Sequence, residues 1–292
     1  MNIRKIAVTR SGQDGAIYGD LLFRFDHLGK GAVYDLSPLK NQEQSEPCEL
    51  PVLSELMLDR VQELAPHSNS VVFGSERFDP SDELPLLYTN IYNNYAKAEN
   101  PLVGVCCVYR VLREGNCFST RLVQCIEIGF TDDTELWRSG ADTADVRPYG
   151  NFVIDPTADR YYAFVMRDAA SSVRYFSFRL PRLSEGVPHP TLGIPWVTLT
   201  HSDVLGFFDT PYHNYIQGAA VAPDGRIYSV EGFGKNPHPA IRIINPHTKT
   251  QELFFDFYEA GLPIEAELID FYHGRCLYGD AHGNLFELTL LP

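Results

Sequence analysis

Two short motifs place amide side chains beside aromatic rings and are the first candidates for chemistry in this sequence. They are Asn93-Asn94-Tyr95 and His213-Asn214-Tyr215. An amide both donates and accepts hydrogen bonds, and an aromatic ring covers the apolar CH face of a sugar, so this combination suits a saccharide. Asn and Tyr also close turns between strands without any ligand, and that alternative stays open.

Acidic residues offer a second chemistry, because two carboxyl groups on either side of a glycosidic bond can hydrolyse it. The candidates are Asp14, Asp20, Asp168, Glu231 and Glu267. A carboxyl separation of about 5–5.5 Å would predict retention of configuration and a larger one inversion. The nine histidines have no metal-ligand spacing, and His213 and His282 are the two acid–base candidates among them.

Composition excludes several classes of protein. The chain has 38 acidic and 24 basic residues and a formal charge of −14, which argues against a nucleic-acid partner. No apolar run reaches the roughly 18–20 residues of a membrane span, so we expect no membrane partner. The six cysteines form no Cys-x-x-Cys pair, which predicts buried free thiols and a cytoplasmic location. The strong local signatures for nucleotide, dinucleotide, hydrolase-elbow and zincin chemistry do not occur in the sequence.

The elements that must position these residues are short strands. Apolar runs rich in Val, Ile, Tyr and Phe alternate with Gly, Pro, Asp and Asn, and helical periodicity is scarce. The clearest unit holds four strands, at 218–222, 226–231, 240–244 and 251–255. Its first turn, Pro223-Asp224-Gly225, combines a fixed φ with a position that accepts φ > 0.

The same layout recurs in five units, and a period of about 40–50 residues indicates a propeller or a solenoid. The other units begin near residues 5, 70, 151 and 266. We expect the third to close near Trp196 and the three-stranded last unit to be completed by a strand around residues 3–8. Residues 54–65 have helical spacing and predict a short outer helix or an irregular outer strand, while 37–52 and 131–147 are expected to be loops.

Two segments resemble known propeller repeats. Residues 275–288 resemble the strand–turn–strand signature of quinoprotein-type propellers, and residues 218–228 are similar to the blade opening of NHL-repeat and gluconolactonase-like propellers. The resemblance implies an all-β fold, one five-bladed β-propeller over residues 1–292. Six blades are the alternative if residues 37–66 hold further strands.

The propeller fold implies a ligand site at the axial mouth, where loops enter the inner strand and leave the second strand of each blade. The expected ligand-binding residues are Asn69, Asn94, Tyr95, Asn151, Arg167, Asn214, Gln217 and His282. Catalytic candidates at the same mouth are Glu231, Glu267, Asp168 and His213. His67, Asn93, Tyr149, Glu265 and Asp280 complete the set.

The gluconolactonase-like resemblance also implies a divalent ion held by a Glu, Asn side chains and an Asp from different blades. Glu267, Asn151, Asn214 and Asp280 match those residue types, with Glu231 as the alternative glutamate. Oxygen ligands suit Ca²⁺ or Mg²⁺, which could polarise a carbonyl or activate water.

Three functions therefore stay open. The first is the binding of a small polar ligand, such as a saccharide, with no required cofactor. The second is hydrolysis at the same mouth, either lactonase-like with a metal or glycosidase-like. The third is a scaffold that binds protein partners on its rim.

Overall fold

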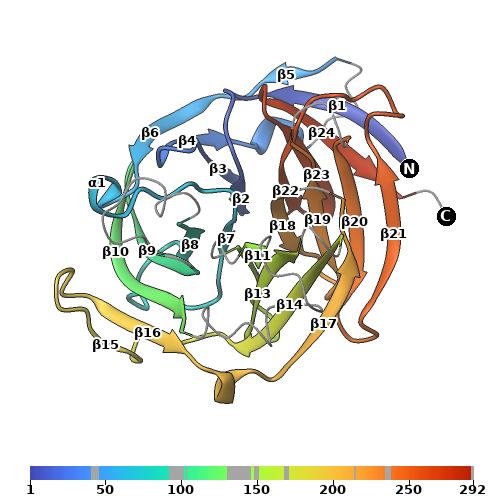
Figure 1. Ribbon diagram of the computed structural model, residues 1–292. Helices are drawn as coiled ribbons and strands as arrows, with labels where there is room; N and C mark the ends of the chain where they lie inside the picture. Colours follow the sequence, from blue (N-terminus) through green and yellow to red (C-terminus); the bar gives the residue numbers. More distant parts are fainter. Residues whose placement is uncertain are drawn as a thin grey trace.

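The computed structural model describes residues 1–40, 46–91, 102, 104–129, 146–147, 151–167, 171–213, 215–233 and 238–290. Their strands form five sheets arranged in a ring (Figure 1), which makes the molecule a five-bladed β-propeller, as the sequence predicted. None of the helices in these described ranges is long and apolar enough to cross a membrane.

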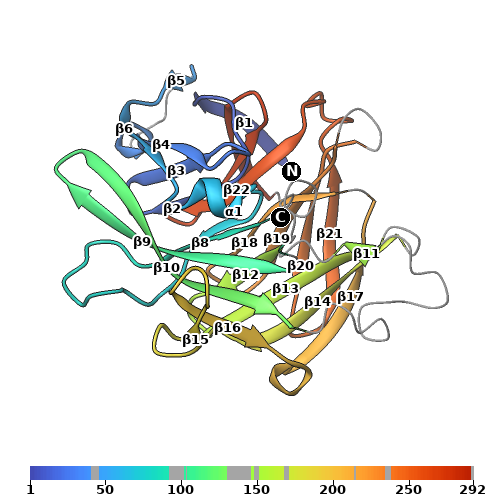
Figure 2. The same ribbon diagram turned by 60° about the vertical axis from the view of Figure 1, so that its left-hand side comes forward.

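The first two blades follow each other along the chain. The first contains β2 (Gly15–Tyr18), β3 (Leu21–Phe25), β4 (Lys30–Asp35) and β6 (Val52–Met57), in that order from the axis outward. The second contains β7 (Val71–Phe73), β8 (Leu87–Asn90), β9 (Val105–Glu114) and β10 (Cys117–Ile128). The long strands β9 and β10 form a hairpin that projects beyond the ring (Figure 2).

The third and fourth blades have the same meander. The third contains β12 (Phe152–Asp155), β13 (Arg160–Arg167), β14 (Ser172–Arg179) and β17 (Gly206–Pro211), and β11 (Val146–Arg147) pairs with the end of β13. The fourth contains β18 (Ile216–Val221), β19 (Ile227–Glu231), β20 (Ala240–Asn245) and β21 (Thr250–Asp256). Gly225, in the predicted Pro-Asp-Gly turn, has φ +83°, which explains why glycine occupies this position.

The fifth blade joins the two ends of the chain. It contains β22 (Ala266–Tyr272), β23 (Arg275–Asp280) and β24 (Asn284–Thr289), and β1 (Asn2–Val8) pairs antiparallel with β24 from Asn2↔Thr289 to Val8↔Asn284. The short β5 (Cys48–Glu49) then pairs with β1. The predicted closure is confirmed: the N-terminal strand covers an edge that β24 would otherwise expose.

The hydrophobic core is divided into five clusters, one at each junction between neighbouring blades. In β13, for example, Phe164 packs toward the fourth blade and Val165 toward the second. Because every blade is covered on both faces, its inner strands are apolar on both sides and lack a simple alternation of apolar and polar residues. The core therefore surrounds the axis and leaves polar residues to the ends of the strands.

Two sequence predictions need correction. The strand β16 (Pro195–Leu199) does not close the third blade, because it pairs in parallel with β10 at Cys125↔Trp196 and extends the second blade together with β15 (Val187–Pro188). The indole of Trp196 packs into the junction of the first two blades and donates to Glu127 Oε2 at 2.8 Å, which holds the strand there. The closing strand of the third blade is β17.

Residues 54–65 combine both predicted alternatives. The first half belongs to the outer strand β6, and α1 (Val61–Leu64) is a single helical turn. Residues 37–52, expected to be a loop, contain a 3₁₀ turn at Ser37–Leu39 and the strand β5. Another 3₁₀ turn, at His201–Asp203, follows β16. Of the second expected loop, 131–147, the structure describes only β11 at its end.

The prediction of buried thiols is confirmed for four of the six cysteines. All six cysteines are free, and four of them, Cys106, Cys107, Cys125 and Cys276, are buried. Cys48 is half-buried. Cys117 is exposed because it lies at the tip of the β9–β10 hairpin, beyond the reach of the neighbouring blades.

Candidate functional site

Each blade contributes one buried polar residue where its inner strand begins. These residues are Asp14, Asn69, Asn151, Gln217 and Glu267, and none has more than 6% of its surface exposed. The inner strands contact one another around the centre of the ring, where Figure 1 shows β2, β7, β18 and β22. We call these five residues the axial ring, and this end of the propeller the axial mouth.

Local backbone geometry directs two members of the axial ring. The pairing of β18 with β19 shifts register between Ile216 and Gly218, and that of β22 with β23 shifts between Ala266 and Leu268. Gln217 and Glu267 are therefore bulged residues, and a bulge changes the direction of its side chain. A Cβ on Gly218 would lie 2.5 Å from the Glu267 carbonyl oxygen and 3.1 Å from Asp14 Oδ1, so glycine allows three blades to approach closely here.

Hydrogen bonds cross all five junctions between blades at the mouth. The donor and acceptor atoms are Val71 N and Asp14 Oδ2 (2.9 Å), Asn90 Nδ2 and Asn151 Oδ1 (2.7 Å), Ile216 N and Met166 Sδ (3.3 Å), Gln217 Nε2 and Glu265 Oε1 (2.5 Å), and Gln13 Nε2 and Glu267 Oε1 (3.1 Å). The mouth is thus a connected polar network and its side chains are held in place.

Several buried atoms in this network have no partner among the described residues. They include Asp14 Oδ1, Glu267 Oε2 and Asn151 Nδ2, together with the hydroxyls of Ser68 and Ser70. Buried polar atoms in folded proteins are nearly always hydrogen-bonded, and an unsatisfied one costs about 1–3 kcal/mol. The mouth therefore contains several polar atoms that the described residues leave unsatisfied.

Burial also changes the acidity of the two axial carboxyls. It raises the pKa of Asp14 and that of Glu267 well above the ordinary range, because the charged form loses its hydration. The negative charges of Glu265 and Asp14 raise the pKa of Glu267 further, and Arg24 opposes the rise. Burial thus favours the protonated form of each carboxyl, which donates as well as accepts hydrogen bonds.

Arg24 is a buried cation beside this pair, with 3% of its surface exposed. Its guanidinium donates to the carbonyl oxygens of Gln13 (3.2 Å), Gly12 (3.2 Å) and Asp280 (2.6 Å) and to Thr9 Oγ1 (2.7 Å). None of these acceptors is a carboxylate. The positive charge therefore acts on Asp14 and Glu267 through space, without occupying their oxygen atoms.

Glu231, another predicted catalytic residue, has a different environment. Both of its oxygens accept from Arg242, at 3.1 Å from Nε and 2.9 Å from Nη2, and both side chains are buried. Arg242 also donates to Gln251 and lies over the ring of Phe254 at 4.4 Å. Burial raises the pKa of Glu231, and Arg242 opposes the rise. Both oxygens of this carboxylate are therefore engaged by Arg242, and the backbone of His213 bonds to it as well.

Two of the predicted metal ligands, Asp280 and Asn151, are engaged in protein hydrogen bonds. The Asp280 carboxylate accepts from the backbone of His282 (3.0 Å) and from the backbone and side chain of Asn284 (2.9 and 2.6 Å), which ties the turn between β23 and β24. Asn151 Oδ1 accepts from Asn90. The described part of the chain contains no group of three His, Cys, Asp or Glu side chains able to hold an ion. The Ca²⁺ or Mg²⁺ site stays a prediction.

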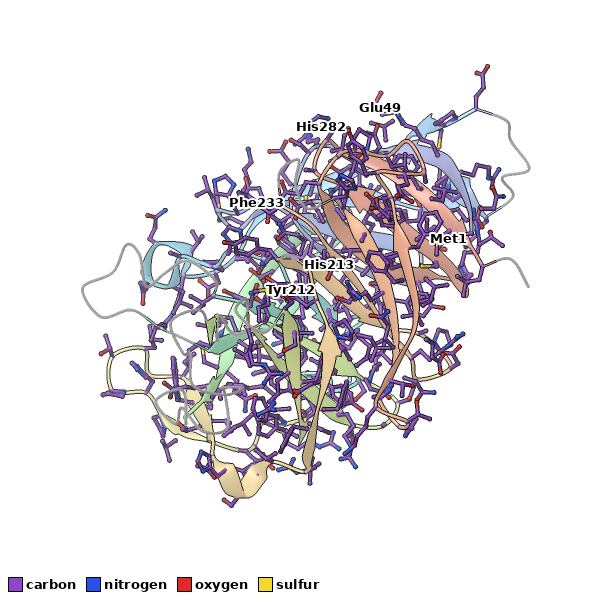
Figure 3. All side chains as sticks on the ribbon, turned by 45° about the vertical axis from the view of Figure 1, so that its right-hand side comes forward. Met1, Glu49, Tyr212, His213, Phe233 and His282 are labelled. Atoms are coloured by element: carbon purple, nitrogen blue, oxygen red, sulfur yellow. The ribbon has the colours of Figure 1, made fainter. Side chains whose placement is uncertain are left out.

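The remaining predicted residues are distributed as follows. Arg167 is buried at the end of β13, on the mouth side of the third blade, and His67 is half-buried before β7. His213 and His282 are exposed, and Figure 3 shows them well apart, so they do not flank one substrate. Asp20 lies at the opposite end of the propeller, in the turn between β2 and β3, and pairs with Lys40 at 2.6 Å.

Six predicted residues lie outside the described ranges, namely Asn93, Asn94, Tyr95, Tyr149, Asp168 and Asn214. Three residues that shape the mouth were not predicted: Asn90, Arg24 and Arg242. Asn90 donates to both Asn69 (2.6 Å) and Asn151 and ends the second strand of its blade. A polar residue at the end of an otherwise apolar second strand was the signal that could have identified it.

Comparison with known proteins adds no function. No family model matches this chain, and no curated protein matches its sequence. Similar solved structures include glutaminyl cyclase from Myxococcus xanthus, with 12% identity and a TM-score of 0.46 over 98% of this chain and 93% of that one. A luciferin-regenerating enzyme has 8% identity and a TM-score of 0.45 over 99% and 95% of the two chains.

A third similar structure is the PQQ-bound aldose sugar dehydrogenase from Streptomyces coelicolor, with 14% identity and a TM-score of 0.43 over 99% of this chain and 81% of that one. At such identities and TM-scores these likenesses carry no argument about ligand or activity. The assignment of the fold rests on the strand pairing described above.

Proposed function

We propose that this protein binds a small polyhydroxylated molecule of the saccharide class at the axial mouth. The observation that carries the proposal is the set of buried, unbonded polar atoms of Asp14, Asn151 and Glu267, which come from three different blades. A single ligand on the axis would reach atoms from several blades at once.

The chemistry of these atoms favours hydroxyl groups as partners. Asn151 Nδ2 can only donate, while Asp14 Oδ1 and Glu267 Oε2 accept when ionised and donate when protonated. A hydroxyl both donates and accepts, so a ring of hydroxyls satisfies all of them at once. Gln217 and Asn69 are already bonded within the protein and hold the frame of the site.

Titration calorimetry with a panel of mono- and disaccharides tests this proposal. Replacing Asn151 with Ala should weaken binding by about 0.5–1.5 kcal/mol, the net value of a neutral hydrogen bond. The matched control is Asn245→Ala, an identical change in the turn between β20 and β21, where the side chain bonds to Glu252. Equal affinities for wild type and both variants, or no binding by any saccharide of the panel, would contradict the proposal.

A second candidate function is acid–base catalysis on the bound saccharide. It is favoured by the unbonded oxygen that Glu267 and Asp14 each keep and by burial, which raises the pKa of both carboxyls and so favours the protonated form that a general acid needs. Glu267→Gln should then abolish hydrolysis of aryl glycosides or lactones and retain saccharide binding. A chelator arm separates the metal-dependent alternative, because EDTA would stop only that form of the reaction.

A further inference from the structure

The junction between the fourth and fifth blades has more half-buried apolar side chains than any other junction among the described residues. Seven of them pack against its core, whereas each other junction has two to four. A cavity of about 360 Å³ lies in this junction, beside the turn between β22 and β23 that contains Gly274. This turn is at the end of the propeller opposite the axial mouth. Figure 3 accordingly shows Met1, which lines the cavity, well apart from His213 and Phe233.

Strands of both blades line the cavity with apolar side chains. The fourth blade contributes Tyr228 and Ile241, and the fifth contributes Phe271, Cys276 and Leu288. The rings of Tyr228 and Phe271 meet edge to face, with centroids 5.0 Å apart and an interplanar angle of 88°. Aromatic rings prefer this arrangement, and a further ring gains the same kind of contact when it packs beside such a pair. The walls therefore favour an aromatic ligand.

The two charged residues of the lining are bonded to each other. Arg275 donates from Nε to Glu287 Oε1 (2.6 Å) and from Nη2 to Glu287 Oε2 (3.0 Å), and its Nη1 donates to Leu39 O (2.8 Å). A charged ligand would lose its hydration in the cavity, where each charge of the wall already has its counter-charge. The cavity therefore favours a neutral molecule.

The volume of the cavity sets the size of the ligand. Small-molecule sites typically measure about 300–1,000 Å³, so 360 Å³ is enough for one small molecule. Benzene binds in an apolar protein cavity of about 150 Å³, so this larger cavity accommodates about two fused rings. A ligand of that size would remove apolar surface of both blades from water, which stabilises the complex.

We propose that the cavity between the fourth and fifth blades binds a small, neutral, aromatic molecule of about two fused rings, in the size class of indole or naphthol. Each part of this description has its own observation. The volume sets the size, the pair of Arg275 and Glu287 sets the charge, and the pair of Tyr228 and Phe271 sets the aromatic character. This second site does not depend on saccharide binding at the axial mouth.

Titration calorimetry at pH 7 with three probes of one shape class tests the ligand chemistry. The probes are 2-naphthol, decahydro-2-naphthol and naphthalene-2-sulfonate. Wild type should bind 2-naphthol about two- to tenfold more tightly than its saturated analogue, which cannot make the aromatic contact. It should bind the sulfonate at least about tenfold more weakly than 2-naphthol, because a buried charge loses its hydration.

The methionine methyl groups locate the bound probe in the unmodified protein. The chain has three methionines, and each has a different environment. Met1 lines this cavity, Met57 lines a different cavity beside His27 and His67, and Met166 is buried between the third and fourth blades. In ¹³C-methyl methionine spectra, ring currents of bound 2-naphthol should shift the Met1 signal and leave those of Met57 and Met166 in place.

One variant blocks the cavity and a matched variant controls for the substitution. Cys276→Leu adds volume inside the cavity and should weaken 2-naphthol binding by at least about fivefold, because the added atoms occupy space that the ligand needs. Cys117→Leu makes the same change at the exposed tip of the β9–β10 hairpin and should leave the affinity unchanged. Melting curves check that both variants fold, and the methionine spectra need no variant.

Each outcome supports or contradicts the proposal. A shift of Met57 in place of Met1, or equal 2-naphthol affinities of wild type and Cys276→Leu, would place the probe elsewhere and overturn this site. Binding of the sulfonate or of decahydro-2-naphthol as tightly as 2-naphthol would overturn the neutral or the aromatic character of the ligand. Absence of 2-naphthol binding overturns the whole inference and leaves the proposed function at the axial mouth intact.

Discussion

Two buried acidic sites at the axial mouth differ in how their charge is balanced. In the fourth blade, Glu231 has both oxygens on Arg242, which follows it on the next strand. Between the first and fifth blades, Glu267 receives one bond from the neutral amide of Gln13 and keeps Oε2 unbonded, while Arg24 is bonded to carbonyl oxygens and a hydroxyl.

The difference separates a structural carboxylate from one available for a ligand. A buried ion pair with complete hydrogen bonds holds two strands together and has nothing left for another molecule. A buried carboxyl with a raised pKa and a free oxygen costs stability, and such groups are concentrated at functional sites. Glu231 and Glu267 are equally buried, so their hydrogen-bond partners distinguish the two carboxyls.

The largest effect on the free energy of unfolding should come from breaking the ion pair between Glu231 and Arg242. Arg242→Met leaves Glu231 buried without its cation and should lower the free energy of unfolding by about 3–5 kcal/mol in urea denaturation. The double variant Glu231→Gln with Arg242→Met also removes the unpaired negative charge of Glu231. It should recover most of the lost free energy of unfolding. If the single variant is as stable as wild type, the pair is not what balances Glu231.

Replacing Glu267, whose Oε2 is unbonded, should change the stability in the opposite direction. Glu267→Gln replaces an acid whose ionised form is disfavoured by burial with a neutral group of similar shape. We expect the free energy of unfolding at pH 8 to rise, because the variant removes an acid that burial penalises in its charged form. A loss of stability comparable to that of Arg242→Met would show that Glu267 is structural after all.

The pH dependence of stability should show the same contrast. Asp14 and Glu267 have raised pKa values, and burial raises that of Asp270, which links the first and fifth blades through Ile17 N, to about 7. The folded state therefore binds more protons than the unfolded state. The contribution of Asp270 is present at low pH and is lost as the pH rises through about 7.

Urea denaturation between about pH 5 and pH 8.5 measures this slope. Asp270→Asn should flatten it, and so should Glu267→Gln. Carboxyls with lowered pKa values, such as Glu287 at about 2, lose their contribution only in stronger acid and do not affect this window. A stability that rises with pH across the window would contradict the assigned directions.

The smallest effect is expected for an exposed pair. Lys40 and Asp20 are 2.6 Å apart, as close as many buried pairs, but both side chains are more than a third exposed. Lys40→Ala should change the free energy of unfolding by no more than about 0.5 kcal/mol, because water and salt screen such pairs. A larger change would mean that an exposed ion pair at short distance stabilises the fold as much as a buried one does.

Much of the fold could be predicted because it depends on local patterns. Short apolar runs and turn residues determine where strands begin and end, and their recurrence determines five blades and the closure by β1. Four members of the axial ring, Asn69, Asn151, Gln217 and Glu267, were predicted for the same reason, since each lies at the entry of an inner strand. Trp196 was assigned to the wrong blade because parallel pairing with β10 leaves no local signal.

What the sequence alone determined is therefore the ring of blades and the polar residues at its mouth. Only the tertiary structure decided that Glu231 is paired with an arginine and that Glu267 keeps an unbonded oxygen. Glu231 is paired by an arginine eleven residues away on an adjacent strand, whereas the neighbours of Glu267 come from the other end of the chain. Desolvation and charge balance depend on every blade that closes around a group, so they arise only when the ring is complete.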